Sequence, residues 1–457
     1  MSDSAATQLQ ENKMGTMPVG RLIFSMSIPM MISMLVQALY NIVDSIFVAQ
    51  ISEDALTAVS LAFPIQNLMI AVAVGTAVGV NALLSRRLGE KNQEDVDKCA
   101  GNSLFLSAAS AVVFIILGFT IPRFFFETQT DNPAIIEYGV TYMEICLIWC
   151  LGVFCSIMLE RLLASTGRTG LSMVSQLVGT AFNLVFDPLL IFGYWGFPEL
   201  GIAGAAIATV MGQFAAMITS LILNLKYNKD INFKLKHLIP NGRIIKGIYS
   251  VGVPSILLQS VGSVMVYFLN MILGAFSSTA IAVFGVYFKL QSFIFMPIFG
   301  LNNGVVPIIA YNFGARKKSR IKRAVFVGTI SAFCIMTVGT LIFEILPGWL
   351  LGFFNASEQM LFMGIPALRI IAVHFPIAAI CIIFGSVLQA FGEGVKSMIV
   401  SFIRQLVVLL PVAWLLSLTG NVNAVWWAFP IAETASLTCT LIFYSGLNKK
   451  YLRPMAD

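Results

Sequence analysis

The chain has 457 residues, of which 58% are hydrophobic and only 11% are charged, and its formal net charge is +6. A soluble protein would carry roughly 25% charged residues. This composition excludes an ordinary soluble domain and indicates a polytopic membrane protein, because apolar stretches of about 20 residues, the length of a spanning helix, recur along the chain.

Twelve apolar runs follow one another in chain order. They are continuously apolar rather than alternating with a period of two, which favours helices over a barrel. The sequence therefore predicts an all-α membrane protein with twelve spanning helices. The runs cover residues 22–50, 55–84, 101–122, 134–158, 170–194, 201–225, 247–275, 280–311, 324–346, 361–387, 397–419 and 422–446.

Basic residues gather at alternate connections between these runs, and the intervening connections, such as "SEDALT" and "FSSTA", are nearly bare of them. This is the positive-inside pattern, which places both termini in the cytoplasm and requires an even number of spans. The net positive charge could suggest that the protein binds nucleic acid, but the positions of the basic residues argue against this. The clusters are Arg86, Arg87, Lys91 and Lys98; Lys226, Lys229, Lys234, Lys236, Arg243 and Lys246; Arg316, Lys317, Lys318, Arg320, Lys322 and Arg323; and Lys449, Lys450 and Arg453.

The two halves of the chain match at an offset of about 225 residues, which pairs Pro29 with Pro254, Gln66 with Gln291 and Gly89 with Gly314. Each half holds six spans, so both halves have the same orientation, which is typical of transporters that rock one bundle against the other. The expected domains are a disordered cytoplasmic N-terminus (1–16), an N-lobe (17–225), a basic cytoplasmic linker (226–246), a C-lobe (247–448) and a cytoplasmic tail (449–457).

Two carboxylates lie deep in spans of the first half, where a charge costs on the order of 2.5–3.5 kcal/mol. Asp44 has Tyr40 one helical turn before it, and Asp187 has Asn183 at the same spacing, so each pair points in one direction. Carboxylate, amide and hydroxyl oxygens can hold H⁺ or Na⁺. We therefore expect a coupling-ion site, with Asp44, Asn183 and Asp187 as the candidate Na⁺ ligands.

The second half lacks this acidic cluster. At the repeat offset, Asp44 falls on Leu269 and Asp187 on Val412. Carboxylates that served only to join helices would be expected in both halves, so the asymmetry indicates a function confined to the first lobe.

Other polar side chains within the spans are weaker signals. Candidates for the lining of a substrate cavity are Gln37, Asn41, Gln66, Gln259, Gln291, Lys289 and Glu433. Residues whose role stays open between the cavity and a paired or interfacial position are Glu144, Arg369, His374, Lys289, Arg404 and Glu433. Glu160 and Arg161, near the inner end of the fourth span, are expected to form a local ion pair.

The chain resembles the multidrug and toxic compound extrusion (MATE) transporters of bacteria over nearly its full length. The likeness is carried by "YNIVDSIFV", "LSRRLGEK", "GRTGLSM", "NLVFDPLLIF" and "GIAGAAIATVMGQ", in this order. It implies a V-shaped pair of six-helix bundles that exports organic cations, often drugs, in exchange for H⁺ or Na⁺.

The resemblance also assigns roles to single residues. It implies cation coupling by Tyr40, Asp44, Asn183, Asp187 and Thr209, and a bend of the first helix at Pro29. Some members carry a further acid on the seventh helix, where this chain has Gln259 as its nearest candidate. The first prediction for function is thus an ion-coupled multidrug antiporter, a monomer in the plasma membrane that needs no cofactor.

Three alternatives belong to other classes. A lipid-linked oligosaccharide flippase of the same superfamily would need a strongly positive cavity and usually about fourteen spans. An integral-membrane enzyme lacks support, because no HExxH or well-placed GxSxG is present and the chain has only two histidines. A channel is disfavoured by the two-lobe repeat without a filter-like loop.

Overall fold

The computed structural model describes residues 12–354 and 356–455 of the chain. Helices dominate the first half, and a single 3₁₀ turn, Tyr194–Gly196, interrupts them near the end of that half. The helices of the first half are α1 (Lys13–Thr16), α2 (Val19–Ile51), α3 (Glu53–Gly89), α4 (Gln93–Thr120), α5 (Pro122–Glu127), α6 (Pro133–Ile148), α7 (Leu151–Ser165), α8 (Thr169–Phe192) and α9 (Ile202–Tyr227).

The second half repeats this arrangement after a 3₁₀ turn, Leu235–Leu238, in the connection between the lobes. Its helices are α10 (Gly242–Gly274), α11 (Ser278–Gly314), α12 (Lys318–Ile345), α13 (Pro347–Gly352), α14 (Glu358–Ala372), α15 (Phe375–Ala390), α16 (Gly394–Phe402), α17 (Leu410–Ser417), α18 (Val422–Val425) and α19 (Ala428–Leu447). Two π-helical segments, Ile403–Leu409 and Asn448–Leu452, continue α16 and α19.

The predicted twelve spans are confirmed. Within the described residues, ten helices are long and apolar enough to cross a membrane, and two bent pairs bring the number to twelve. The pairs are α6 with α7, bent by 47°, and α14 with α15, bent by 45°. Their breaks, next to Trp149 and His374, are equivalent in the repeat, so both lobes bend their fourth span at the same place.

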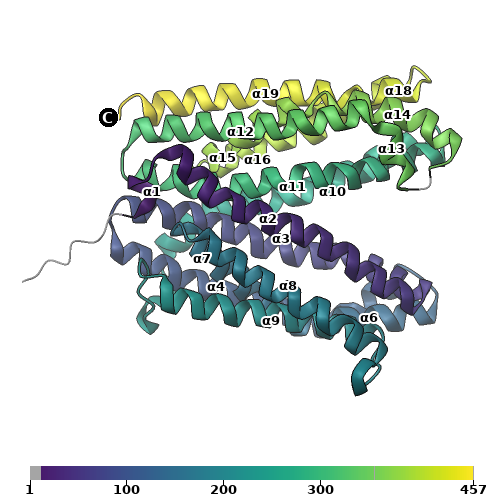
Figure 1. The fold of residues 1–457 in the computed structure, drawn as a ribbon, viewed down its shortest axis with the longest axis horizontal. Coiled ribbons are helices and arrows are strands. Elements are labelled where there is room, and N and C mark those ends of the chain that lie inside the picture. Colours follow the sequence, from purple (N-terminus) through teal and green to yellow (C-terminus); the bar gives the residue numbers. More distant parts are fainter. Residues whose placement is uncertain (1–11, 355, 456–457) are drawn as a thin grey trace, which may run out of the picture.

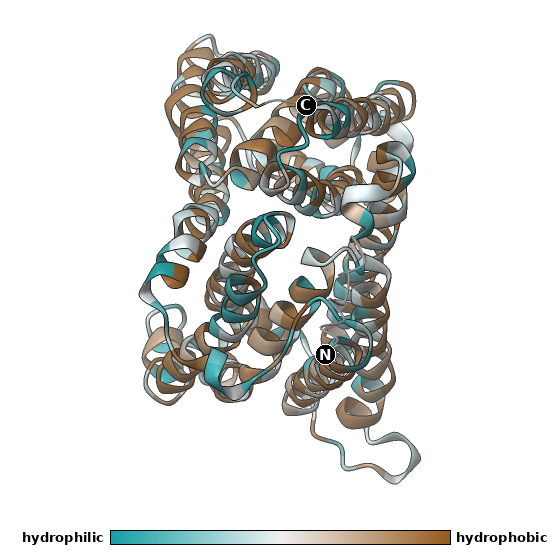
Figure 2. Cartoon of the chain, turned by 90° about the vertical axis from the view of Figure 1, so that its left-hand side faces the viewer, coloured by the Kyte–Doolittle hydropathy of each residue, from teal (hydrophilic) through white to brown (hydrophobic). Residues whose placement is uncertain are grey.

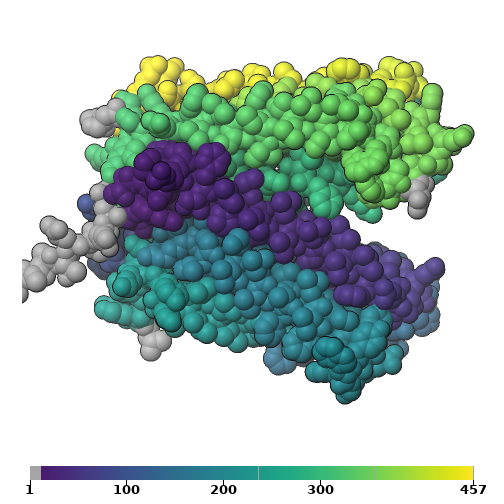
Figure 3. Space-filling view, viewed as in Figure 1, coloured from purple at the N-terminus to yellow at the C-terminus, as the bar shows by residue number. Residues whose placement is uncertain are grey.

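The six-helix bundles form a V (Figures 1 and 3). They meet at the end where the described chain begins and ends, and a cleft separates them at the opposite end (Figure 3). At the closed end the first helix of each lobe crosses to the other lobe: α2 packs on α11, and α10 packs on α3. Viewed from this end, hydrophilic residues lie mainly in the connections, and hydrophobic residues dominate the helices (Figure 2).

Two glycines at equivalent positions of the repeat allow α3 and α11 to approach each other closely at the closed end. A Cβ atom on Gly89 would lie 1.9 Å from the Tyr311 carbonyl oxygen, and one on Gly314 would lie 2.1 Å from the Arg86 carbonyl oxygen. No side chain fits at either position. The ends of α3 and α11 can therefore touch only because both carry glycine there.

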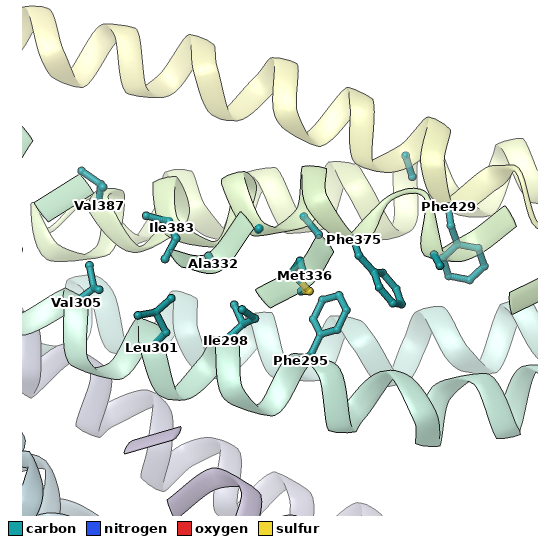
Figure 4. Packing of buried hydrophobic residues seen from close by; sticks show 14 of the residues in the cluster. Phe295, Ile298, Leu301, Val305, Ala332, Met336, Phe375, Ile383, Val387 and Phe429 are labelled. Atoms are coloured by element: carbon teal, nitrogen blue, oxygen red, sulfur yellow. The ribbon is translucent and has the colours of Figure 1, made fainter. Parts of the chain in front are cut away.

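The C-lobe holds a continuous hydrophobic core beneath α12, α15 and α19. One face of α11 presents Phe295, Ile298, Leu301 and Val305 to residues of α12 and α15 (Figure 4). This spacing of three to four residues is the apolar stripe expected of a packed helix. The lobe therefore behaves as one packed body, against which α2 of the first lobe lies.

The predicted domain boundaries need correction at three places. Residues 12–16 of the segment expected to be disordered are ordered and include α1, because Met14 is fully buried between the lobes; residues 1–11 lie outside the described part of the chain. The linker is shorter than 226–246, since α9 extends to Tyr227 and α10 begins at Gly242. The tail expected from residue 449 begins with the π-helical segment that ends at Leu452.

Candidate functional site

The polar centre of the N-lobe is built on α8 and α9. Asp187 is completely buried, and Asn183 lies one turn before it on the same face of α8. With its amide nitrogen toward the carboxylate, Asn183 donates to Asp187 Oδ2 at 2.8 Å, and its oxygen accepts from the Thr209 backbone nitrogen at 3.1 Å. The close approach of α8 and α9 makes these bonds feasible, because glycines lie at the contact: a Cβ on Gly212 would be 2.7 Å from the Gly179 carbonyl oxygen.

Helix α2 brings the other two predicted residues to the same place. The Tyr40 hydroxyl lies beside Thr209, and the carboxyl groups of Asp44 and Asp187 lie within hydrogen-bonding reach of each other. Asp44 Oδ1 is buried and has no hydrogen-bond partner among the described residues. Two carboxylates at this distance repel unless a proton or another cation lies between them. All five residues predicted for cation coupling thus form one cluster.

A cavity of about 690 Å³ opens beside this cluster, and every residue that lines it belongs to the N-lobe. Its volume is typical of pockets for drug-sized ligands. Asp44, Tyr40, Asn183 and Thr209 face the cavity, whereas Asp187 lies behind them. An ion that enters from the cavity therefore meets Asp44 before Asp187.

The rest of the cavity wall is mostly apolar, with thioethers and amides at intervals. Three of the predicted lining residues, Gln37, Asn41 and Gln66, lie in this wall. Gln37 accepts a hydrogen bond of 2.8 Å from Gln176 Nε2, which joins α2 to α8. Further members of the wall are Met30, Met34, Phe63, Met69, Ile70, Val74, Tyr142, Cys146, Val153, Ile157 and Gln213.

The inner end of the cavity carries Glu160 and Arg161, and the ion pair expected between them is wrong. Their side chains take different partners: Glu160 Oε1 accepts from Ser175 at 3.3 Å, and Arg161 Nη1 donates to Asn303 Oδ1 of the C-lobe at 3.1 Å. Both residues line the cavity. The sequence gives only a weak signal for this, because adjacent residues on a helix point about 100° apart.

The predicted lining residues of the second lobe do not line this cavity. Gln259 and Gln291 are half-buried on α10 and α11, and Lys289 is exposed, with its amino group 6.0 Å from the Phe354 ring. Glu433 is buried inside the C-lobe. The reason is geometric: the lobes diverge toward the open end, so the second lobe faces the cleft there and not the cavity inside the first lobe.

Glu433 is held by Arg404. Arg404 Nη1 donates to Glu433 Oε2 at 3.1 Å across the contact between α19 and the π-helical segment Ile403–Leu409. His374 Nδ1 lies 2.5 Å from the Ile371 carbonyl oxygen at the break of the fourth span, and its ring stacks on Phe429. These groups thus have local structural partners in the C-lobe.

Two remaining intramembrane charges lie at the surface. Arg369 donates to the Glu344 carbonyl oxygen at 3.1 Å, and its side chain is about half exposed. Glu144 is exposed on α6 and does not line the cavity. Both positions favour the interfacial interpretation over a place in the substrate site.

Pro29 lies inside α2, where the helix is continuous from Val19 to Ile51. The contact between the lobes is close here: Ser27 Oγ donates to the Leu301 carbonyl oxygen at 3.3 Å, and a Cβ on Gly304 would lie 2.4 Å from Ser27 Oγ. The bend at Pro29 stays a prediction.

Tyr142 and Cys146 are cavity residues that the sequence alone did not single out. Gln66 Nε2 lies 3.3 Å from the Tyr142 hydroxyl and 3.6 Å from Cys146 Sγ. The two residues are one turn apart on α6, and this spacing is the only sign of a shared face that the sequence contains. Within the described residues, no group of three or more His, Cys, Asp or Glu side chains could hold a metal ion.

Comparison with known proteins gives a consistent result. The profile of the MatE family matches residues 29–189 and 254–415, one match in each lobe at the offset of the internal repeat. The chain is 26% identical over 433 residues to "Multidrug export protein MepA" of Staphylococcus aureus (strain bovine RF122 / ET3-1), a match that covers 93% of this chain and 94% of the relative. It is 27% identical over 425 residues to the protein of the same name from Staphylococcus haemolyticus (strain JCSC1435), with 93% of each chain covered.

Among solved structures, one described as "Outward-facing conformation of a multidrug resistance MATE family transporter of the MOP superfamily" matches with a TM-score of 0.89 and 25% identity. The match covers 96% of this chain and 99% of that one. The V shape in Figure 3 is thus found in a protein whose description gives its conformation as outward-facing.

Proposed function

We propose that this chain, which belongs to the MATE family, is a secondary active antiporter. It exports organic, mostly cationic amphipathic compounds in exchange for H⁺ or Na⁺. The two staphylococcal relatives reported above are named multidrug export proteins. The basic connections and both described chain ends lie at the closed end of the V, so the positive-inside rule makes the open end extracellular.

One observation carries the coupling part of this proposal: the carboxyl groups of Asp44 and Asp187 lie within hydrogen-bonding reach in a membrane-embedded lobe. Two negative charges in this position destabilise each other, whereas a single proton or Na⁺ between them relieves the repulsion. Asn183 and Thr209 fix the orientation of Asp187. The cluster can therefore exist in an ion-loaded and an ion-free state of different electrostatic energy, as coupling requires.

The cavity supports the substrate class. Asp44 is shared between the ion cluster and the cavity wall, so an organic cation in the cavity and a coupling ion compete for the same carboxylate. The apolar and thioether part of the wall can adapt to varied hydrophobic groups. Binding of the coupling ion from the open side would then weaken the hold on the organic cation and favour its release to that side.

The flippase alternative finds no support in the cavity. Its lining includes the carboxyl groups of Asp44 and Glu160 and one guanidinium group, that of Arg161. A site for pyrophosphate would need a clear excess of basic groups. The balance of charge in this wall favours a cation.

The test uses purified protein in proteoliposomes that contain a fluorescent organic cation such as ethidium. A pH gradient and a Na⁺ gradient are imposed separately, each at zero membrane potential. Efflux driven by either gradient supports ion-coupled export, and the effective gradient identifies the ion. The proposal is wrong if neither gradient drives movement of ethidium or of other amphipathic cations.

A further inference from the structure

Residues Asn12–Met17, here called the strap, lie across the closed end of the V. The strap includes α1 and precedes α2. In Figure 3 the start of the described chain, in purple, covers the junction between the two lobes. The Met14 side chain is completely buried there and belongs to the hydrophobic core of the C-lobe.

The C-lobe holds the strap by four hydrogen bonds to its backbone. Asn312 Nδ2 and Arg320 Nη2 donate to the Met14 carbonyl oxygen at 3.0 and 2.9 Å. Lys317 Nζ donates to the Gly15 carbonyl oxygen at 3.0 Å, and Arg320 Nη2 also donates to the Met17 carbonyl oxygen at 2.8 Å. Bonds from charged donors are the stronger kind, so this side of the strap is firmly attached.

The N-lobe holds the strap at one point. Asn12 Nδ2 donates to the Thr166 carbonyl oxygen at 3.0 Å in the turn between α7 and α8. Next to it, Gly167 adopts a φ of +86°, and a Cβ there would lie 3.2 Å from Lys13 Cε. The strap therefore rests directly on this turn, and within residues 12–354 and 356–455 one hydrogen bond joins the two.

The linker between the lobes makes a related contact on the other side. Asn102 of the N-lobe donates to the His237 and Ile239 carbonyl oxygens, each at 3.2 Å, and accepts from the Asn241 backbone nitrogen at 2.7 Å. The segment before the first helix of each lobe is thus held by a buried asparagine of the opposite lobe. Among the described side chains of these two segments, one also bonds to the lobe whose first helix the segment precedes: Asn12 of the strap, which donates to Thr166.

We propose that the strap is a releasable latch between the lobes, and that the Asn12–Thr166 hydrogen bond is its release point. This inference rests on the alternating access of the proposed function, in which the lobes must separate at this end. The four bonds to the C-lobe then stay intact, and the single bond to the N-lobe breaks. The latch stabilises the conformation that is open to the outside without contacting substrate or coupling ion.

The sharpest variant is Asn12→Asp. The Asn12 side chain has two roles: its Oδ1 accepts from the Met14 backbone nitrogen at 3.0 Å and caps α1, and its Nδ2 reaches Thr166. Aspartate keeps the cap but cannot donate to the carbonyl oxygen. Asn92→Ala is the control, because Asn92 Oδ1 caps α4 at the same end by accepting from the Asp95 backbone nitrogen, and in the described part of the chain its side chain makes no hydrogen bond between the lobes.

The measured quantity is the distance between two spin labels, one at Tyr227 of α9 and one at Lys322 of α12, which are both exposed. The labels are placed in full-length protein whose seven cysteines are replaced by serine. We expect Asn12→Asp to lower the ratio of closed to open populations at this end by about tenfold, the factor that corresponds to 1.4 kcal/mol. Asn92→Ala should leave the ratio unchanged.

The latch is refuted if Asn12→Asp leaves the distance distribution as it is, or if Asn92→Ala changes it equally. This readout needs neither drug nor ion gradient. Failure of the wild-type protein to transport cations would contradict the proposed function, whereas an unchanged distribution in Asn12→Asp would contradict the latch alone.

Discussion

The carboxyl group of Asp44 on α2 lies within hydrogen-bonding reach of that of Asp187 on α8. Asp187 is fully buried and oriented by Asn183, whereas Asp44 faces the cavity and keeps one oxygen without a partner. The pair is therefore unequal: one acid is fixed, and the other can exchange its partner between the coupling ion and a substrate.

The first prediction concerns Asp44→Asn. The amide cannot carry the negative charge that attracts a cation, so we expect gradient-driven efflux of ethidium from proteoliposomes to fall at least about tenfold, a loss of at least about 1.4 kcal/mol in coupling. Glu144→Gln is the matched control, because it removes an exposed carboxylate of the same lobe outside the cavity. Full efflux in Asp44→Asn would contradict the role given to the pair.

A second prediction tests whether the hydroxyl group of Thr209, rather than the volume of its side chain, supports the ion site. The Thr209 side chain lies beside Tyr40, and its hydroxyl oxygen is 3.3 Å from the Asn183 side chain. Thr209→Val keeps the volume but leaves these partners unsatisfied, at a cost of about 1–3 kcal/mol. The ion concentration for half-maximal efflux should rise about tenfold in Thr209→Val and stay near the wild-type value in Thr209→Ser. Equal behaviour of the two variants would show that the hydroxyl has no part in the ion site.

A third prediction concerns the ion pair of Arg404 and Glu433 in the C-lobe. Glu433 is only 3% exposed, so removal of its charge in Glu433→Ala leaves Arg404 without its partner and should destabilise the protein by about 3 kcal/mol. The double variant Arg404→Met with Glu433→Leu should recover most of this loss, because apolar groups of similar size need no partner. Thermal unfolding in detergent measures both. Ethidium efflux per folded molecule should stay unchanged in the double variant.

The fourth prediction concerns Lys13→Met, which should stabilise the docked strap, whereas Asn12→Asp should destabilise it. Burial, together with the nearby Arg168 guanidinium, lowers the pKa of Lys13 below its ordinary value of 10.5. The charged amine is therefore disfavoured in the docked strap, and docking becomes more stable as the pH rises through this lowered pKa toward 10.5. Lys13→Met removes the same penalty at neutral pH.

We expect Lys13→Met to increase the closed population measured with the Tyr227 and Lys322 labels, and Lys449→Met, an exposed lysine at the same end, to have no effect. A lower closed population in Lys13→Met would show that the amine stabilises the docked strap, contrary to the burial seen here.

Much of this molecule follows from the sequence alone. Twelve spans, the repeat and the pairing of Gly89 with Gly314 could be predicted, because the thickness of a bilayer fixes the length of each apolar run and a repeated fold repeats its contacts. The pairs Tyr40–Asp44 and Asn183–Asp187 could also be predicted from their spacing, whereas Thr209 followed only from the resemblance to the MATE family. Buried carboxylates are costly in a membrane, so their partners must lie near them.

The tertiary structure alone decided which polar residues share a cavity and which segments join the lobes. Gln259, Gln291 and Glu433 were as plausible for the cavity as Gln37 and Gln66, because a helical period shows that residues share a face but not which neighbour that face meets. Residues 12–16 of the strap belong to the segment 1–16, for which the mostly polar sequence predicts disorder. Its order comes from Asn312, Lys317 and Arg320, which are distant in sequence and satisfy its backbone only once both lobes have folded.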